Sequence, residues 1–261
     1  MISTCSRPLA TAAILAAIAL VVPGLAATAS AAPAASATKA PSCPLPHFGP
    51  GRDYHPQIDP ASFSPDVTNE FFPLVVGRTL IFSGVKDGLP ALNIFTTTSR
   101  TRVIDGVTTR VVEDRLYLAN VLEERTSDYY SQDRCGNVWY FGEDTATLDA
   151  HGHVLSTDGS FHAGVDGAEP GVFMQSQPTV GRQFRQEWSK GQAEDAFKAI
   201  SLDSPVTVPY GSFQHALRTS ETTALEPGVL DNKFFVKGIG EVVETAVRGP
   251  LERLTLVEII S

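Results

Sequence analysis

Apolar and polar residues alternate through most of the chain after residue 66, and short turn motifs interrupt the alternation at intervals typical of antiparallel strands. The clearest interruption is Asp105-Gly106, which lies inside RTRVIDGVTTRVV between two runs rich in β-branched residues. Asp-Gly favours a two-residue hairpin turn, because both central residues of that turn need positive φ. The pattern therefore predicts a β-hairpin formed by residues 92–104 and 107–118.

Turn motifs of the same kind recur as far as the C-terminus. DRCGNV and DAHGHV share the spacing D-x-x-G-x-V, which is typical of a hairpin turn with glycine in the left-handed position. Further strands are expected at residues 79–82, 121–132, 137–141, 183–190, 213–223, 233–237, 240–247 and 251–260. The predicted fold class is all-β and mainly antiparallel, as a single curved sheet or a half-barrel.

Two segments depart from this alternation. Residues 157–181 are rich in glycine and proline and form the longest irregular stretch. Their apolar residues, such as Phe161 and Phe173, suit a long loop that acts as a lid. Residues 192–202 fit either a helix turn or a strand, and their propensities slightly favour a helix.

The N-terminus has a different organisation. Arg7 precedes the apolar stretch LATAAILAAIALVVPGL, and Ala29-Ser30-Ala31 supplies small residues for cleavage. Residues 1–31 are therefore predicted to be a signal peptide that is removed near Ala31–Ala32. Cleavage there would leave no stable membrane span and would place the mature protein outside the cell.

Residues 32–65 are expected to form an N-terminal arm, followed by a β domain at residues 66–261. Seven prolines lie between residues 41 and 65, and each fixes φ and removes a backbone donor, so the arm is unsuited to the interior of a sheet. Cys43 in the arm and Cys135 in the DRCG turn remain after cleavage. In an exported protein such a pair suggests a disulfide, and two unpaired thiols are the alternative.

The net charge and the lack of known catalytic motifs argue against several classes of function. The formal net charge is −9, which gives no electrostatic reason to bind nucleic acid or anionic lipid headgroups. The chain has no G-x-S-x-G elbow, and Gly238-Ile239-Gly240 matches only the first half of a dinucleotide-binding motif. We therefore predict no catalytic residue and no cofactor, and the oligomeric state stays open.

An aromatic hairpin is the strongest candidate for a binding site. Tyr129 and Tyr130 lie on one expected strand, and Trp139, Tyr140 and Phe141 lie on the next. Neighbouring residues of a strand point to opposite faces, so rings are expected on both faces of the sheet. One interpretation is ordinary core packing. The other is the wall of a pocket for a lipid or another apolar small molecule.

Histidines near this hairpin are weaker candidates for a metal site. His151 and His153 are two residues apart, and His162 follows close by in the sequence. Imidazoles combined with a carboxylate suit Zn²⁺ or Cu²⁺. However, Gly152 places the first pair in a turn, where the two side chains need not share a face.

Carboxylates also follow the aromatic hairpin, at Glu143, Asp144 and Asp149. Paired carboxylates beside aromatic rings suit the hydrolysis of glycosidic bonds, in which one acts as acid and the other as base or nucleophile. A secreted hydrolase with acidic residues at 143–149 is therefore the alternative from a different functional class.

The C-terminal third carries a further pattern. The run VPYGSF at residues 208–213 is followed by FFVKGIGEVV at residues 234–243. This layout resembles that of bacterial envelope proteins of the TapB-like type, and residues 71–84 fit the same group. Residues 129–145 resemble a set of uncharacterised secreted actinobacterial proteins. The resemblance covers most of residues 69–261 and implies a curved antiparallel sheet of the lipoprotein-carrier kind, without assigned catalytic residues.

Together these observations favour a secreted, non-catalytic β domain that binds an apolar ligand or a cell-envelope partner. The hydrolase is one alternative. A purely structural envelope protein without any pocket is the other. A deep apolar cavity would favour the binding domain, whereas converging carboxylates with raised pKa values would favour the enzyme.

Overall fold

A computed structural model describes residues 43–261, so the predicted signal peptide lies outside the described residues. Within this range the chain forms two short 3₁₀ helices and sixteen strands. The helices are η1 (Gly51–Asp53) and η2 (Pro60–Ser62), and the strands are β1 (Phe63–Ser64), β2 (Thr79–Lys86), β3 (Leu89–Ile104), β4 (Val107–Leu118), β5 (Val121–Asp133), β6 (Val138–Leu148), β7 (Val154–Ser156), β8 (Phe161–His162), β9 (Glu169–Met174), β10 (Gln183–Arg185), β11 (Glu187–Trp188), β12 (Asp195–Val208), β13 (Gly211–Thr223), β14 (Leu230–Val236), β15 (Gly240–Arg248) and β16 (Glu252–Ile260).

The strands form one antiparallel sheet, as predicted. Its order is β10-β12-β13-β14-β15-β16-β2-β3-β4-β5-β6-β9-β11, and most neighbours in the sheet are also neighbours along the chain. Strand β1 pairs with β5, and β7 and β8 pair with β6. Every ladder between these strands is antiparallel.

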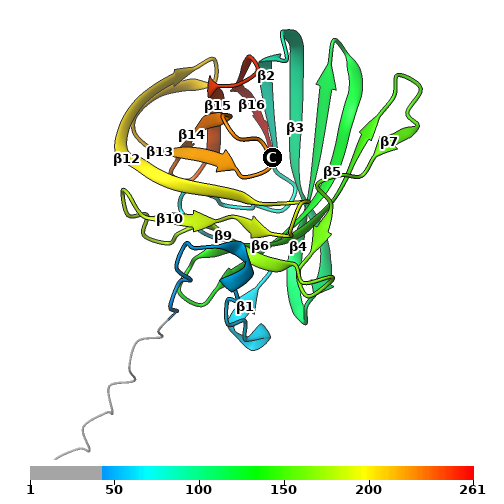
Figure 1. The fold of residues 1–261 in the computed structure, drawn as a ribbon. Coiled ribbons are helices and arrows are strands. Elements are labelled where there is room, and N and C mark those ends of the chain that lie inside the picture. The colour runs from blue at the N-terminus through cyan, green and yellow to red at the C-terminus, as the bar shows by residue number, and fades with distance from the viewer. Residues whose placement is uncertain (1–42) are drawn as a thin grey trace, which may run out of the picture. The chain divides into compact units, whose positions relative to one another are not determined.

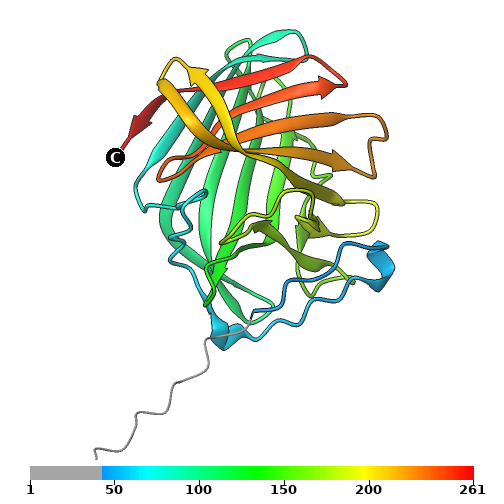
Figure 2. The same cartoon turned by 90° about the vertical axis from the view of Figure 1, so that its left-hand side faces the viewer.

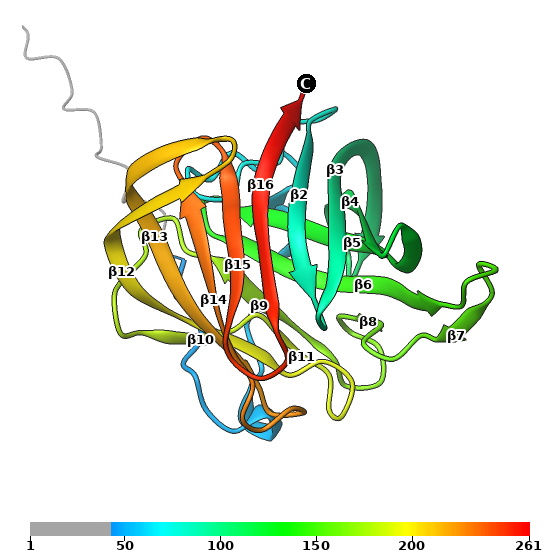
Figure 3. The same ribbon diagram turned by 90° about the horizontal axis from the view of Figure 1, so that it is seen from above.

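The sheet curves until its two ends approach each other, which gives a nearly closed barrel. Figure 1 shows β12–β14 on one side and β3 and β5 on the other, and Figure 3 shows β16 and β2 joining the two sides. At the far ends of the sheet, β10 pairs with β12 and β11 pairs with β9, and Gln186 alone separates β10 from β11. The closure is therefore more complete than a half-barrel.

The Asp105-Gly106 turn is confirmed. Asp105 has φ 49° and Gly106 has φ 75°, and the flanking residues Ile104 and Val107 pair directly. The turn between β4 and β5 has the same character, since Ala119 and Asn120 also have positive φ. Two-residue turns of this kind match the twist of the strands that they join.

The structure decides the state of one segment that the sequence left open, and it differs from the expectation for another. Residues 192–202 contribute to strand β12, in which Phe197 is buried, because pairing with β10 and β13 outweighs a weak helix propensity. Residues 157–181 contain β8 and β9 rather than an irregular lid. Strand β9 joins the sheet beside β6, and its residues Val172 and Met174 are buried.

The described part of the N-terminal arm, residues 43–65, runs along the lower part of the domain in Figure 2. Its last residues form β1, and the Phe63 ring packs edge-on against Trp139 and Phe141, at centroid distances of 6.0 and 5.3 Å. The Tyr54 hydroxyl donates a hydrogen bond to the carbonyl of Pro170 in β9, 3.2 Å away. These contacts hold the arm against β5, β6 and β9.

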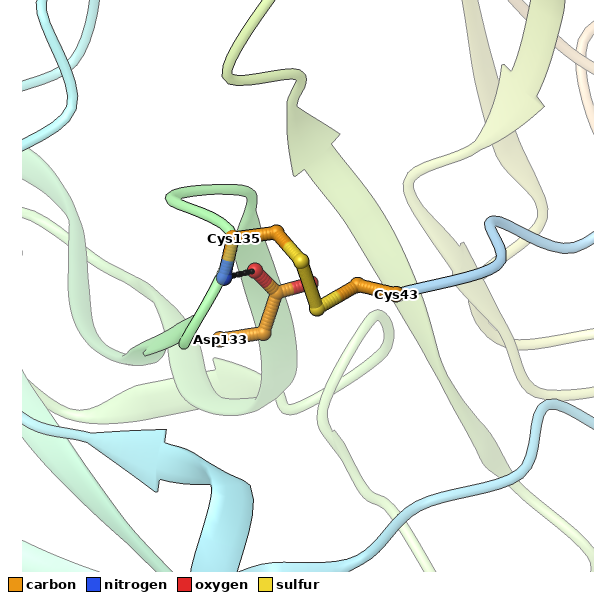
Figure 4. Close-up of side chains that lie close together, drawn as sticks. All are labelled: Cys43, Asp133 and Cys135. Carbon is orange, nitrogen blue, oxygen red and sulfur yellow. Dashed lines mark hydrogen bonds between the residues drawn. A yellow bond between two sulfur atoms is a disulfide. The ribbon is translucent and has the colours of Figure 1, made fainter. Parts of the chain in front are cut away.

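The predicted disulfide between Cys43 and Cys135 is also confirmed (Figure 4). The two Cα atoms are 6.0 Å apart, within the usual range for a disulfide. Asp133 shapes the turn that presents Cys135, because its carboxylate accepts hydrogen bonds from the backbone N–H groups of Cys135 and Asn137. The bond joins the arm to the turn between β5 and β6.

Candidate functional site

A cavity of about 120 Å³ lies inside the barrel, between the β2–β4 side and the β14–β15 side. Side chains from six strands and from the segment before β2 meet there. They are Phe72, Pro73, Leu74, Leu80, Phe82, Asn93, Phe95, Asp114, Phe173, Lys233, Ile239, Gly240, Glu241 and Glu244.

One part of the lining is apolar and consists mainly of phenylalanine rings. Leu80 and Phe82 are two residues apart on β2 and therefore face the same side of the sheet. Phe72 reaches the cavity from the segment before β2, and its ring packs against Phe95 and Phe173 at centroid distances of 6.0 and 4.5 Å. Phe72 thus contacts two other rings of the lining, so this part of the wall is well packed.

The other part of the lining is charged. Lys233 lies directly across the β14–β15 ladder from Glu244, and its Nζ is 3.3 Å from Glu244 Oε1. The same Nζ is 3.5 Å from Glu221 Oε2 and 4.0 Å from Glu241 Oε2. Burial alone would lower the pKa of Lys233, but these carboxylates raise it well above its usual value.

The two other carboxyl groups of the lining, those of Asp114 and Glu241, are less well paired with a cation than that of Glu244. Asp114 accepts a hydrogen bond from the Nδ2 of Asn93, and burial raises the pKa of Asp114 to about 8. Burial also raises the pKa of Glu241 well above its usual value, against the opposing effect of Lys233. Both groups are therefore held in an environment that disfavours their charged form.

More carboxyl groups lie in the interior around this cavity, and burial raises the pKa of each. They are Asp128, Glu143, Glu187 and Glu221. Asp128 accepts a hydrogen bond of 2.6 Å from the hydroxyl of Tyr140. Within residues 43–261, Lys233 is the one cation that lies within 4.0 Å of any of these four groups. The interior of the barrel therefore holds more acidic than basic groups.

The five rings of the aromatic hairpin are all buried and lie on both faces of the sheet. Tyr130 and Tyr140 stack at a centroid distance of 4.7 Å, and Tyr130 contacts Phe72 and Phe173 at 5.1 and 4.9 Å. These two tyrosines thus form a layer behind the rings that line the cavity.

The other three rings of the hairpin pack elsewhere. Trp139 and Phe141 lie under Phe63 of the arm, and the Trp139 Nε1 donates a hydrogen bond to Asp133, 3.1 Å away. The Tyr129 hydroxyl donates a hydrogen bond of 2.6 Å to Asp144. The five rings of the hairpin therefore lie in two separate environments, with Tyr130 and Tyr140 on the side of the cavity and the other three on the opposite face of the sheet.

A second, more open cavity of about 320 Å³ lies beside β6 and β8, and Glu143, Asp144 and His162 contribute to its lining. Burial raises the pKa of Glu143 well above its usual value. Burial also acts to raise the pKa of Asp144, but hydrogen bonds from Tyr129 and Arg102 lower it overall. The two adjacent carboxyl groups thus have pKa values displaced in opposite directions.

The third acidic residue of the sequence-based hydrolase hypothesis, Asp149, lies in a different place. Its carboxylate accepts hydrogen bonds from the backbone N–H groups of His151 and His153, 2.8 and 2.9 Å away. Asp149 therefore shapes the turn between β6 and β7 and is not among the residues that line the second cavity.

The three candidate histidines do not form a metal-ligand cluster. The rings of His151 and His153 are 6.2 Å apart on an exposed turn, and His162 Nε2 lies 3.0 Å from Asp144. Within residues 43–261, the one group of three ligand atoms close enough to hold a metal belongs to Cys43, Asp133 and Cys135. Both sulfur atoms of that group are already joined in the disulfide.

Comparison with known proteins gives few matches. No family model and no curated protein matches the chain, so the resemblance noted in the sequence has no support from a family model. Among solved structures, the chain is similar to a protein of Parabacteroides distasonis described as a lipoprotein candidate, with 8% identity and a TM-score of 0.39. The match covers 74% of this chain and 99% of that chain. No helix within residues 43–261 is long and apolar enough to cross a bilayer.

Proposed function

We propose that this domain is exported and binds a small, largely apolar molecule in the cavity inside its barrel, without catalysing a reaction. The observation that carries the proposal is the concave wall formed by Leu80 and four phenylalanine rings. Ligand sites in proteins are typically concave and mostly apolar, with a few polar groups that fix the orientation of the ligand. Asn93 and the charged residues of the lining supply such groups.

The size of the cavity limits the ligand. An apolar cavity of about 150 Å³ is known to hold benzene. The cavity here, at about 120 Å³, therefore fits a molecule of roughly one aromatic ring or a short alkyl chain. We accordingly propose a ligand much smaller than a membrane lipid.

The aromatic hairpin contributes to this site indirectly. Tyr130 contacts both Phe72 and Phe173, and it stacks on Tyr140, whose hydroxyl is held by Asp128. A wall whose side chains are locked by a second layer is preorganised for binding, so less entropy is lost when the ligand is held. We propose that these two tyrosines keep Phe72 and Phe173 in place.

Calorimetric titration with phenyl compounds tests this function. We expect the wild type to bind at least one of phenylethanol, phenylethylamine and phenylacetate. Leu80→Phe should abolish this binding, because the added atoms would fill the cavity, whereas the same change at the exposed Leu202 should leave it intact. If the wild type binds none of the three compounds, this proposal fails.

A second candidate function rests on Glu143 and Asp144. A carboxyl group with a raised pKa beside one with a lowered pKa is the arrangement of an acid and an ionised partner in glycoside hydrolysis. Turnover of chromogenic glycosides by the wild type, lost in Glu143→Gln, would support it. Absence of turnover across a panel of such glycosides would reject it.

A further inference from the structure

We propose that the ligand held in the barrel cavity is an organic cation, namely an ammonium group on a short alkyl chain, with or without an aromatic ring at the other end of that chain. This inference rests on the proposed function and names the class of molecule that the same cavity takes. It follows from three features of the lining: the balance of charges, the carboxyl groups without a cation at hydrogen-bond distance, and the rings beside them.

Carboxyl groups outnumber ammonium groups in the lining of the cavity. Three carboxyl groups, those of Asp114, Glu241 and Glu244, face it together with one ammonium group, that of Lys233. Lys233 is already surrounded, because its Nζ lies within 4.0 Å of Glu221, Glu241 and Glu244. The nearby carboxylates therefore compensate its positive charge, which leaves little attraction for an anionic ligand.

Two of the carboxyl groups lack a cation at hydrogen-bond distance among the described residues. The hydrogen bond to Asp114 comes from the neutral amide of Asn93. The closest cation to Glu241 is Lys233, and the separation of 4.0 Å is longer than a hydrogen bond. Burial raises the pKa of both carboxyl groups, and for Glu241 it outweighs the opposing effect of Lys233. An ammonium group in the cavity would supply a nearby positive charge.

The apolar part of the lining suits the same class of ligand. Four phenylalanine rings, those of Phe72, Phe82, Phe95 and Phe173, line the cavity that the carboxyl groups face. The face of an aromatic ring attracts a cation within about 6 Å, and rings around an ammonium group are a common way to recognise alkylated amines. An ammonium ligand would stabilise the ionised form of these carboxyl groups, whereas a neutral ligand would not, and an anion would oppose their ionisation further.

Titration calorimetry at neutral pH with three phenyl compounds of similar shape tests the charge preference. We expect phenylethylamine to bind at least about tenfold more tightly than phenylethanol, and phenylacetate to bind most weakly. Glu241→Gln should weaken phenylethylamine binding about tenfold more than it weakens phenylethanol binding. The same substitution at Glu258, an exposed residue of β16, is the matched control and should change neither affinity.

The outcomes separate this inference from the proposed function. Equal binding of the amine and the alcohol by the wild type would overturn the inference and leave the proposed function standing, as would tighter binding of phenylacetate. Absence of binding by all three compounds would overturn the proposed function itself. If near-UV circular dichroism shows that Glu241→Gln is not folded, Asp114→Asn takes its place with the same expected loss, and an unchanged affinity for the amine in that variant would overturn the inference.

Discussion

The ammonium group of Lys233 lies 3.3 Å from the carboxylate of Glu244, directly across the ladder between β14 and β15. It also lies 3.5 Å from the carboxylate of Glu221 on β13. One cation thus joins three neighbouring strands inside the barrel. Removing one member of a buried ion pair is costly, because the remaining charge stays buried without its partner.

We therefore expect Lys233→Met to destabilise the domain by about 3–5 kcal/mol near neutral pH. Methionine keeps much of the apolar length of the side chain, so the loss comes mainly from Glu221 and Glu244, which remain without a cation. The free energy of unfolding in urea, followed by circular dichroism, measures this effect. The cost should shrink in mild acid, where the carboxyl groups can take up protons.

Lys237→Met is the matched control. Lys237 pairs with Glu70 at 2.6 Å, but the two side chains are 60% and 66% exposed. Exposed ion pairs contribute only about 0–1 kcal/mol, so this variant should stay close to the wild type. If Lys233→Met lowered the free energy of unfolding no more than Lys237→Met, the carboxyl groups around Lys233 would not be ionised in the native state.

The stability of the domain should fall as the pH rises from about 5 to 7. Burial raises the pKa of Asp114 to about 8 and that of Asp128 to about 7, whereas an aspartate in an unfolded chain titrates near about 3.9. Between these values the native state keeps protons that the unfolded state has released, so each such proton costs about 1.4 kcal/mol of stability per pH unit. Urea unfolding at several pH values measures the slope.

Asp114→Asn should flatten this slope, because the amide has no proton to lose. The lowered pKa of Asp144 does not affect this slope, because between about pH 5 and 7 Asp144 is ionised in both the native and the unfolded state. Stability that is constant or rises between about pH 5 and 7 would contradict the buried, protonated state of these aspartates.

The sequence predicts the strands of this fold better than their closure. The Asp105-Gly106 turn and the alternation around it are local properties, so they are visible without knowledge of any partner strand. The strand at residues 192–202 is different, because its state depends on β10 and β13, which lie on either side of it. Its own residues slightly favour a helix, and only the completed sheet decides between the two.

The cavity was not predictable from the sequence for the same reason. Phe173 and Lys233 line it together only because the sheet curves far enough to bring β9 and β14 to one interior. One local clue was present. Lys233 is two residues from Phe235, which is 1% exposed, so a charged residue shares a face with a core residue. The same relationship holds for Asp128 and Tyr130, and such pairs indicate a polar interior.

Replacing Cys43 with serine should destabilise the domain. The disulfide closes a loop of 92 residues, and loop entropy on its own predicts a loss on the order of 4 kcal/mol. Urea unfolding of the variant measures the loss, and treatment of the wild type with a reducing agent should reproduce it. A reducing agent that lowered the stability of the Cys43→Ser variant as well would show that its effect does not arise from this bond.

Gly106→Val should destabilise the domain by about 1–3 kcal/mol. Gly106 has φ 75°, a conformation that a β-branched residue strongly disfavours, and a Cβ at this position would lie 3.3 Å from Pro60 Cγ. The shift of the thermal midpoint measures the effect. Gly49→Val is the control, since Gly49 has no positive φ and open space around its Cβ position. Equal midpoints for the two variants would mean that the turn carries no special strain.

Trp139→Ala should separate stability from ligand binding. Trp139 is buried beneath Phe63, donates a hydrogen bond to Asp133 and does not line the barrel cavity, so its loss should cost about 3–5 kcal/mol of stability. At a temperature where the variant is still folded, its affinity for phenylethylamine should equal that of the wild type. Phe173→Ala should instead weaken binding, because Phe173 lines the cavity. If folded Trp139→Ala lost binding while Phe173→Ala kept it, the ligand site would lie at the face of the hairpin beneath the N-terminal arm and not inside the barrel.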